Sequence, residues 1–190
     1  MRLENNFEVA AAPDRAWALL NDVPRVVPCM PGAELIETID ENTWKGRVHV
    51  KLGPVSLQFE TDVVRELEDA AARRVVLATK ARELRGRGAA QARIESSLSE
   101  AAGRTKVDIV TELSLQGAVA QYGRGIVPGV AAQLTKQFAD NVAALLERDS
   151  SQASEAKRAP VAEHPVQAIG GLRLGLRALR SRLARIFRRG

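Results

Sequence analysis

Residue types that carry out acid–base, nucleophilic or metal chemistry are sparse in this sequence. The chain has two histidines, His49 and His164, and one cysteine, Cys29. His49 falls on the polar side of an alternating stretch, and His164 lies in a segment rich in Pro, Ala and Glu. These positions form no Ser/His/Asp or Cys/His pattern, and they are too few and too distant for a recognisable zinc site. The sequence therefore favours a protein that is not an enzyme.

Carboxylates are common, but those that can be placed point outward. Glu60 and Asp62 alternate with apolar residues, on the polar side of their strand. A carboxylate needs burial or a like-charged neighbour to become a good general acid near neutral pH. Their positions do not support such a role.

Small and hydroxyl-bearing residues recur on the apolar side of the expected strands. Gly88, Ala90 and Ala92 share one side of a strand that also carries Ile94. Three threonines have similar positions on other strands: Thr61, Thr79 and Thr111. Such residues leave volume and a few polar groups, as the lining of a ligand pocket does. They also allow a helix to approach closely, and the pattern leaves both interpretations open.

A sheet and a helix must position these residues. Alternation with a period of two predicts strands over residues 3–9, 44–52, 55–63, 74–82, 87–98 and 104–115. A short helix is expected over 14–20 after Pro13, and prolines break up the stretch that follows. Apolar residues at three- and four-residue steps predict a long helix over 127–147. A lone helix after an antiparallel sheet must cover the apolar face of that sheet, which indicates an α+β fold.

The space between the sheet and the long helix is the expected ligand site. Trp44 and Phe59 serve as core or as ligand contacts there, and Met30 is a candidate for the cavity mouth. Pro28, Pro31 and Gly32 are interpreted as a backbone turn. The expected ligand-binding residues are Met30, Trp44, Phe59, Thr61, Ala90, Ala92, Tyr122, Leu134 and Phe138.

Three motifs in a fixed order resemble a known family. They are VPCMPGAELIE at residues 27–37, KLGPVSLQFETDV at 51–63 and LQGAVAQYGRGIV at 115–127, followed by a helix that contains QFADNVAALL. Over about residues 2–147 the chain resembles the CoxG family of carbon monoxide dehydrogenase subunits, which lies within the START-like (SRPBCC) superfamily. The resemblance implies a helix-grip fold, in which a curved antiparallel sheet surrounds a long C-terminal helix and a hydrophobic cavity.

The resemblance also implies a function. Members of the family are expected to act beside a molybdenum hydroxylase such as carbon monoxide dehydrogenase, to recruit it to the membrane, and to bind a respiratory quinone, menaquinone or ubiquinone. No covalently bound cofactor and no metal are expected. Because START-like proteins include cyclases and dehydratases, a small cavity enzyme is the alternative.

The basic charge is concentrated at the C-terminus. Residues 151–190 carry nine Lys and Arg against Glu155 and Glu163, whereas the other 150 residues carry 19 basic and 21 acidic groups. This asymmetry indicates an anionic partner for the C-terminal segment alone. The predicted organisation is a ligand-binding domain over 1–148, a flexible linker over 149–169 and a basic amphipathic helix over 170–190.

The final helix combines an apolar stripe with arginines. Leucines at three- and four-residue steps fit an anionic membrane surface, where both the stripe and the charges find partners. A protein groove, the chain's own body and nucleic acid are the other occupants considered, and nucleic acid is disfavoured because the segment has no Tyr or Trp for stacking. The expected membrane-binding residues are Leu172, Leu176, Arg177, Leu179, Arg180, Leu183, Arg185, Ile186 and Phe187.

Localisation follows from what the sequence lacks. A single cysteine permits no intrachain disulfide and fits a reducing compartment. We expect neither a secretory signal nor a membrane-spanning segment. The expected location is the cytoplasm, at the inner face of the cell membrane.

Overall fold

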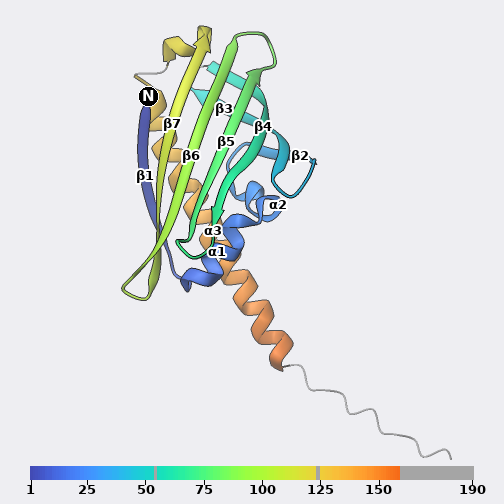
Figure 1. The fold of residues 1–190 in the computed structure, drawn as a ribbon, viewed down its shortest axis with the longest axis vertical. Coiled ribbons are helices and arrows are strands. Elements are labelled where there is room, and N and C mark those ends of the chain that lie inside the picture. The colour runs from blue at the N-terminus through green and yellow to red at the C-terminus, as the bar shows by residue number, and fades with distance from the viewer. Residues whose placement is uncertain (54, 123–124, 159–190) are drawn as a thin grey trace, which may run out of the picture. The chain divides into compact units, whose positions relative to one another are not determined.

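The computed structural model describes residues 1–53, 55–122 and 125–158 (Figure 1). In chain order the elements are β1 (Arg2–Val9), α1 (Pro13–Asn21), α2 (Val23–Val26), η1 (Val27–Cys29), β2 (Ala33–Thr38), β3 (Thr43–Leu52), β4 (Val55–Asp69), β5 (Arg74–Glu83), β6 (Gly88–Ala101), β7 (Arg104–Gly117), η2 (Ala118–Tyr122) and α3 (Val127–Arg158).

The strands form one antiparallel sheet in the order β1-β7-β6-β5-β4-β3-β2. Strand β1 therefore joins the last strand, β7, while β2 forms the opposite edge. Figure 1 shows the sheet curving around α3, which runs along its inner face. The predicted α+β, helix-grip arrangement is confirmed.

Two parts of the sheet differ from the prediction because bulges interrupt the alternation. Strand β2 was not predicted, and its pairing with β3 shifts register between Leu35 and Glu37. Strand β4 continues to Asp69 rather than ending near Val63, with a second shift between Arg65 and Leu67. A bulge adds one residue to one strand, so the period-two pattern is lost on passing it.

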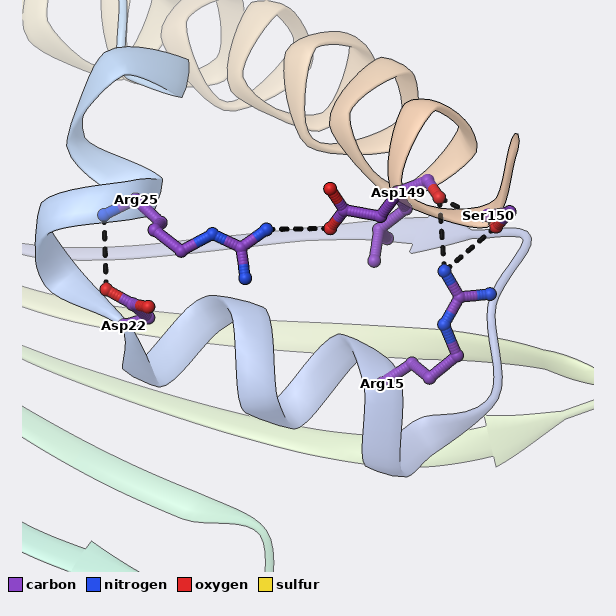
Figure 2. Close-up of polar contacts among 6 residues, drawn as sticks. Arg15, Asp22, Arg25, Asp149 and Ser150 are labelled. Carbon is purple, nitrogen blue, oxygen red and sulfur yellow. Dashed lines mark hydrogen bonds and ion pairs between the residues drawn. The ribbon is translucent and has the colours of Figure 1, made fainter. Parts of the chain in front are cut away.

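Helix α3 is longer than predicted. It continues to Arg158, so residues 149–158, which were expected to begin the linker, are helical. Figure 2 shows the reason: Arg25 pairs with Asp149 at 2.7 Å, and the Arg15 guanidinium donates to Ser150 Oγ at 2.8 Å. These polar contacts from α1 and α2 hold the helix beyond its apolar stripe. The remainder of the expected linker and the expected amphipathic helix lie outside the described residues.

The core consists of two clusters at opposite ends of the sheet. The base cluster lies beside α1 and joins sheet residues such as Phe7 and Val107 to Val142 and Leu146 of α3. The loop-end cluster lies where β3–β4, β5–β6 and β7–α3 connect, and it comprises Leu52, Leu57, Phe59 and Val119 with partly buried residues, including Val130 of α3, packed against it. Helix α3 therefore contacts the inner face at both ends.

Candidate ligand site between the sheet and helix α3

The strand register decides which side chains face α3. Ala81 and Ala90 pair across β5 and β6, and both pack against the loop-end cluster with Val130 of α3. Thr61 of β4 lies opposite Ala81, so it shares this inner face. Ala92, two residues from Ala90, also faces inward. The predicted inward positions of Thr61, Ala90 and Ala92 are confirmed.

Between the two clusters lies a group of inward-facing residues that belongs to neither. Val130 and Phe138 of α3 pack against the loop-end and base clusters respectively, and Leu134 lies one helical turn from each. We call these inward-facing residues the central interval: Thr61, Thr79, Ala92, Ile94, Thr111, Leu113 and Leu134.

The residues of the central interval are more exposed than expected for a sheet face that a helix covers. Apart from Thr61, its members are only half-buried, although most lie on inner strands of a sheet covered by α3. Protein interiors are close-packed, and a filled core would exclude water from such residues. This partial exposure, together with the small size of the Thr and Ala members, indicates that side chains leave room between the sheet and α3.

Thr61 places a buried polar group, its hydroxyl, in the central interval. Thr61 is 7% exposed, and its hydroxyl has no hydrogen-bond partner among the described residues. The Thr79 hydroxyl, in contrast, donates to the carbonyl of Ala92 at 3.4 Å. A buried hydroxyl without a partner costs about 1–3 kcal/mol, so it is normally satisfied by protein, water or a ligand.

The remaining predicted site residues are distributed around this group. Phe59, Ala90 and Tyr122 belong to or pack against the loop-end cluster. Phe138 meets Phe7 edge-to-face at 5.8 Å and packs against the base cluster. Each of these residues has a packing role.

Trp44 and Met30 lie outside both clusters. Trp44 is 3% exposed, and the Arg65 guanidinium lies 5.1 Å from its ring centroid. Met30 is half-buried and follows η1. Among the nine predicted ligand-binding residues, Thr61, Ala92 and Leu134 are those in the central interval.

Gly88 shows that close backbone approach also explains part of the small-residue pattern. A Cβ at Gly88 would clash with the carbonyl oxygen of Gln116, and its φ of +144° disfavours other residues. Gly88 is therefore required by the pairing of β6 with β7.

Comparison with known proteins identifies the family. The family model for CoxG, a subunit of carbon monoxide dehydrogenase, matches residues 6–147. The chain belongs to the CoxG family. The resemblance seen in the three motifs is confirmed, and a search of the curated proteins found no match.

Solved structures share the fold of this CoxG-family protein. A conserved protein from Geobacillus kaustophilus has a TM-score of 0.69 at 18% identity, covering 78% of this chain and 96% of that chain. The Zhui aromatase/cyclase from Streptomyces sp. R1128 has a TM-score of 0.57 at 19% identity, with coverage of 78% and 94%. Protein Ms6760 from Mycobacterium smegmatis has a TM-score of 0.57 at 15% identity, with coverage of 78% and 92%. The fold is START-like.

Two polar features of the CoxG-family chain were not predicted. Glu83 is 2% exposed and accepts hydrogen bonds from the backbone N–H groups of Arg85 and Arg87 at 2.8 and 3.0 Å. These bonds, Arg87 first, lower the pKa of the Glu83 carboxyl. His49 is exposed, and its Nε2 shares a hydrogen bond with Ser56 Oγ at 2.5 Å. The sequence signal for the Glu83 hydrogen bonds is Gly86, which indicates a tight turn just after Glu83. The backbone N–H groups of such a turn often bond to a nearby side-chain acceptor.

Cys29 is a buried filler, as predicted. It is 5% exposed, and burial raises the pKa of its thiol, partly offset by Arg148. Asn141 of α3 donates to its carbonyl at 2.9 Å and so ties η1 to the helix. Among the described residues, no group of His, Cys, Asp and Glu could hold a metal ion.

Two concavities open at the surface of the described residues. One, of about 640 Å³, is lined mainly by outward-facing residues of β5, β6 and β7, such as Lys80, Gln91 and Glu112, and it also reaches Thr79, Ala92 and Leu113 of the central interval. The other, of about 530 Å³, lies at the base and is lined by Arg15, Arg25 and neighbouring residues (Figure 2). Neither is lined by Thr61 or Leu134.

In the described part of the chain, no helix is long and apolar enough to cross a membrane.

Proposed function

We propose that this CoxG-family protein is a non-catalytic accessory protein that carries a lipid-like ligand. The ligand, an isoprenoid quinone such as menaquinone or ubiquinone, binds between the sheet and α3. The protein couples a molybdenum hydroxylase of the carbon monoxide dehydrogenase kind to the cytoplasmic face of the membrane.

The unpartnered hydroxyl of Thr61 carries the ligand part of this proposal. A quinone ring offers carbonyl oxygens that accept hydrogen bonds but cannot donate them, which complements a free hydroxyl donor. Its isoprenoid chain is apolar and fits Ala92, Ile94 and Leu134, which leave room beside Thr61. The chain's own residues thus bind and orient the ligand without a charged group.

The residues placed near the ligand favour binding over catalysis. Glu83 is ionised and held by backbone N–H groups, so it is a poor general acid. His49 faces away from α3. The aromatase/cyclase with the same fold keeps a small cavity enzyme as the alternative.

The ligand itself tests the proposal. The full chain is purified from cells that make menaquinone or ubiquinone, and it is examined by native mass spectrometry and by lipid extraction. A bound mass that matches a quinone supports the proposal. A protein that neither retains nor takes up menaquinone or ubiquinone contradicts it, and turnover of an added polyketide-like substrate supports the enzyme instead.

Replacement of Thr61 localises the site. Thr61→Val preserves shape and removes the hydroxyl, so quinone affinity should fall roughly two- to tenfold. Thr38→Val is the matched control, because Thr38 is exposed at the end of β2. Equal affinities for both variants would exclude Thr61 as the polar contact.

The membrane part of the proposal rests on the sequence of residues 170–190. A triple change of Leu176, Leu179 and Leu183 to Ser leaves every arginine in place. The variant should lose binding to anionic vesicles if the leucine stripe enters the interface. Retained binding would indicate charge alone, and equal affinity for RNA before and after the change would indicate nucleic acid.

A further inference from the structure

Two large apolar side chains are exposed at the loop end. Leu84, in the β5–β6 connection, is 48% exposed, and Ile126, before α3, is 36% exposed. Both flank the loop-end cluster: the N–H of Leu84 bonds to the carbonyl of Gln58 on β4, and Val130, one turn after Ile126, packs on that cluster. Figure 1 shows the β5–β6 connection and the start of α3 at the same end of the body.

The charges around these two residues are one-sided. Lys51, Arg85 and Arg87 are exposed, and none of their charged side-chain nitrogens lies within 4.0 Å of a carboxylate among the described residues. The described residues of 49–59, 83–92, 113–122 and 125–139 contain a single carboxylate, Glu83. That carboxylate is buried and bound to two backbone N–H groups, so the surface here is cationic.

A second exposed apolar pair has the opposite surroundings. Ile36 and Ile39 are each 49% exposed near the β2 edge. Four acidic residues accompany them in the sequence: Glu34, Glu37, Asp40 and Glu41. Arg47 lies 3.7 Å from Glu34 and Lys45 lies 3.9 Å from Glu37, whereas Asp40 and Glu41 have no cationic nitrogen within 4.0 Å among the described residues. An anionic surface would repel this region and attract the loop end, so apolar exposure alone does not distinguish the two pairs, whereas charge does.

We propose that the loop end is a membrane-contacting surface of its own, separate from the C-terminal helix. Leu84 and Ile126 enter the interfacial layer of an anionic bilayer, and Lys51, Arg85 and Arg87 bind the phosphates of its headgroups. The contact brings the loop-end cluster, which borders the central interval, against the lipid. A lipid-like ligand then passes between bilayer and protein with little exposure to water. The inference goes beyond the proposed function and holds whatever the ligand is.

A fluorescent probe at Leu84 tests the contact directly in the full chain. Leu84→Cys is labelled with an environment-sensitive NBD group, with Ile39→Cys as the matched control. Native Cys29 is 5% exposed, and its raised thiol pKa disfavours alkylation, which labelling of the unmodified chain verifies. The vesicles are equimolar phosphatidylglycerol and phosphatidylcholine.

The expected result is a shift of the Leu84 probe to shorter wavelength on vesicle binding, with the Ile39 probe unchanged. Vesicle binding without a shift at Leu84, or with the same shift at both sites, overturns the loop-end contact. A shift at Ile39 alone would indicate that the acidic edge is the contacting surface and also overturns it. The probe does not report on the ligand, so failure of quinone binding is seen separately.

Paired substitutions measure the contribution of the contact. The double variant Leu84→Ser, Ile126→Ser should bind these vesicles roughly tenfold more weakly, because it lacks the two apolar side chains that enter the bilayer interface. Ile36→Ser with Ile39→Ser should leave the affinity unchanged. Equal affinity of the loop-end variant and the unmodified chain, with both folded by circular dichroism, overturns the proposal.

Discussion

The base and the loop end of the body use charge in opposite ways. At the base, Arg25 pairs with Asp149 and Arg73 with Asp14, each at 2.7 Å. At the loop end, the exposed cations have no carboxylate within 4.0 Å in the part of the chain that the structure describes, and Glu83 is occupied by backbone N–H groups. A paired charge joins elements of the fold, whereas a charge without a partner remains available to a surface or ligand. The base therefore holds the fold together, and the loop end is suited to contact something else.

The largest expected effect separates the two ends by stability. Leu146 is 4% exposed in the base cluster, so Leu146→Ala should lower the free energy of unfolding by about 2–5 kcal/mol. Leu84→Ala at the loop end should change it by less than about 0.5 kcal/mol, because the side chain is exposed. Urea denaturation measures both. A comparable loss for Leu84→Ala would mean that the loop end is packed core.

Two alanines sharpen the boundary between the loop-end cluster and the central interval. Ala90 and Ala92 are both among the ligand-binding residues expected from the sequence. Because Ala90 packs against the cluster, Ala90→Phe should cost about 1–3 kcal/mol of stability. Ala92→Phe should leave the melting temperature nearly unchanged and abolish retention of the ligand. Thermal unfolding and lipid extraction measure the two effects, and equal destabilisation would show that the interval is filled.

The same Thr→Val replacement should change the stability of the fold differently at two buried threonines. Thr105, at the base, is fully buried and donates to the carbonyl of Ala11 at 2.7 Å. Thr105→Val should destabilise the fold by about 1–3 kcal/mol, because it leaves that carbonyl without a donor. Thr61→Val should leave the ligand-free protein equally or more stable, since its hydroxyl has no partner. A loss at Thr61 equal to that at Thr105, measured by denaturation without ligand, would contradict the free hydroxyl.

The ion pair at the base should have a smaller effect. The Arg25 side chain is 48% exposed, and exposed pairs contribute about 0.2–1 kcal/mol, so Arg25→Ala should lower stability by about that amount at low salt. The difference from the unmodified protein should shrink at high ionic strength. Salt-independent destabilisation would show that Arg25 acts through packing instead.

The smallest expected effect concerns pH at the loop end. The folded protein lowers the pKa of Glu83 below its ordinary value of 4.5, so its ionised form contributes stability above that value. This contribution is lost as the pH falls through the lowered pKa of the folded state. Glu83→Gln, which keeps the shape, should therefore be less stable than the unmodified protein near neutral pH, with the difference narrowing on acidification. A difference that is constant with pH would exclude the carboxylate as its source.

The sequence correctly predicted which face of the sheet several residues occupy. The outward positions of His49, Glu60 and Asp62 and the inward positions of Thr61 and Ala92 follow from alternation, and the register confirms them. The predicted site was broader than the central interval, because alternation indicates a face but not the position along it. Phe59, Ala90 and Tyr122 were therefore included although they pack at the loop end.

The sequence by itself determined the α+β class, the family and the face on which each regular residue lies, because these depend on local periodicity and on motifs. Only the tertiary structure decided that α3 continues past Glu147, since Asp149 and Ser150 are held by Arg25 and Arg15 from helices far away in the chain. It also decided which buried threonine has a partner. Thr61 and Thr105 are indistinguishable in the pattern of their strands, and the difference arises from the carbonyl of Ala11, 94 residues from Thr105. Hydrogen-bond partners of this kind are set by packing between distant segments, which no local pattern encodes.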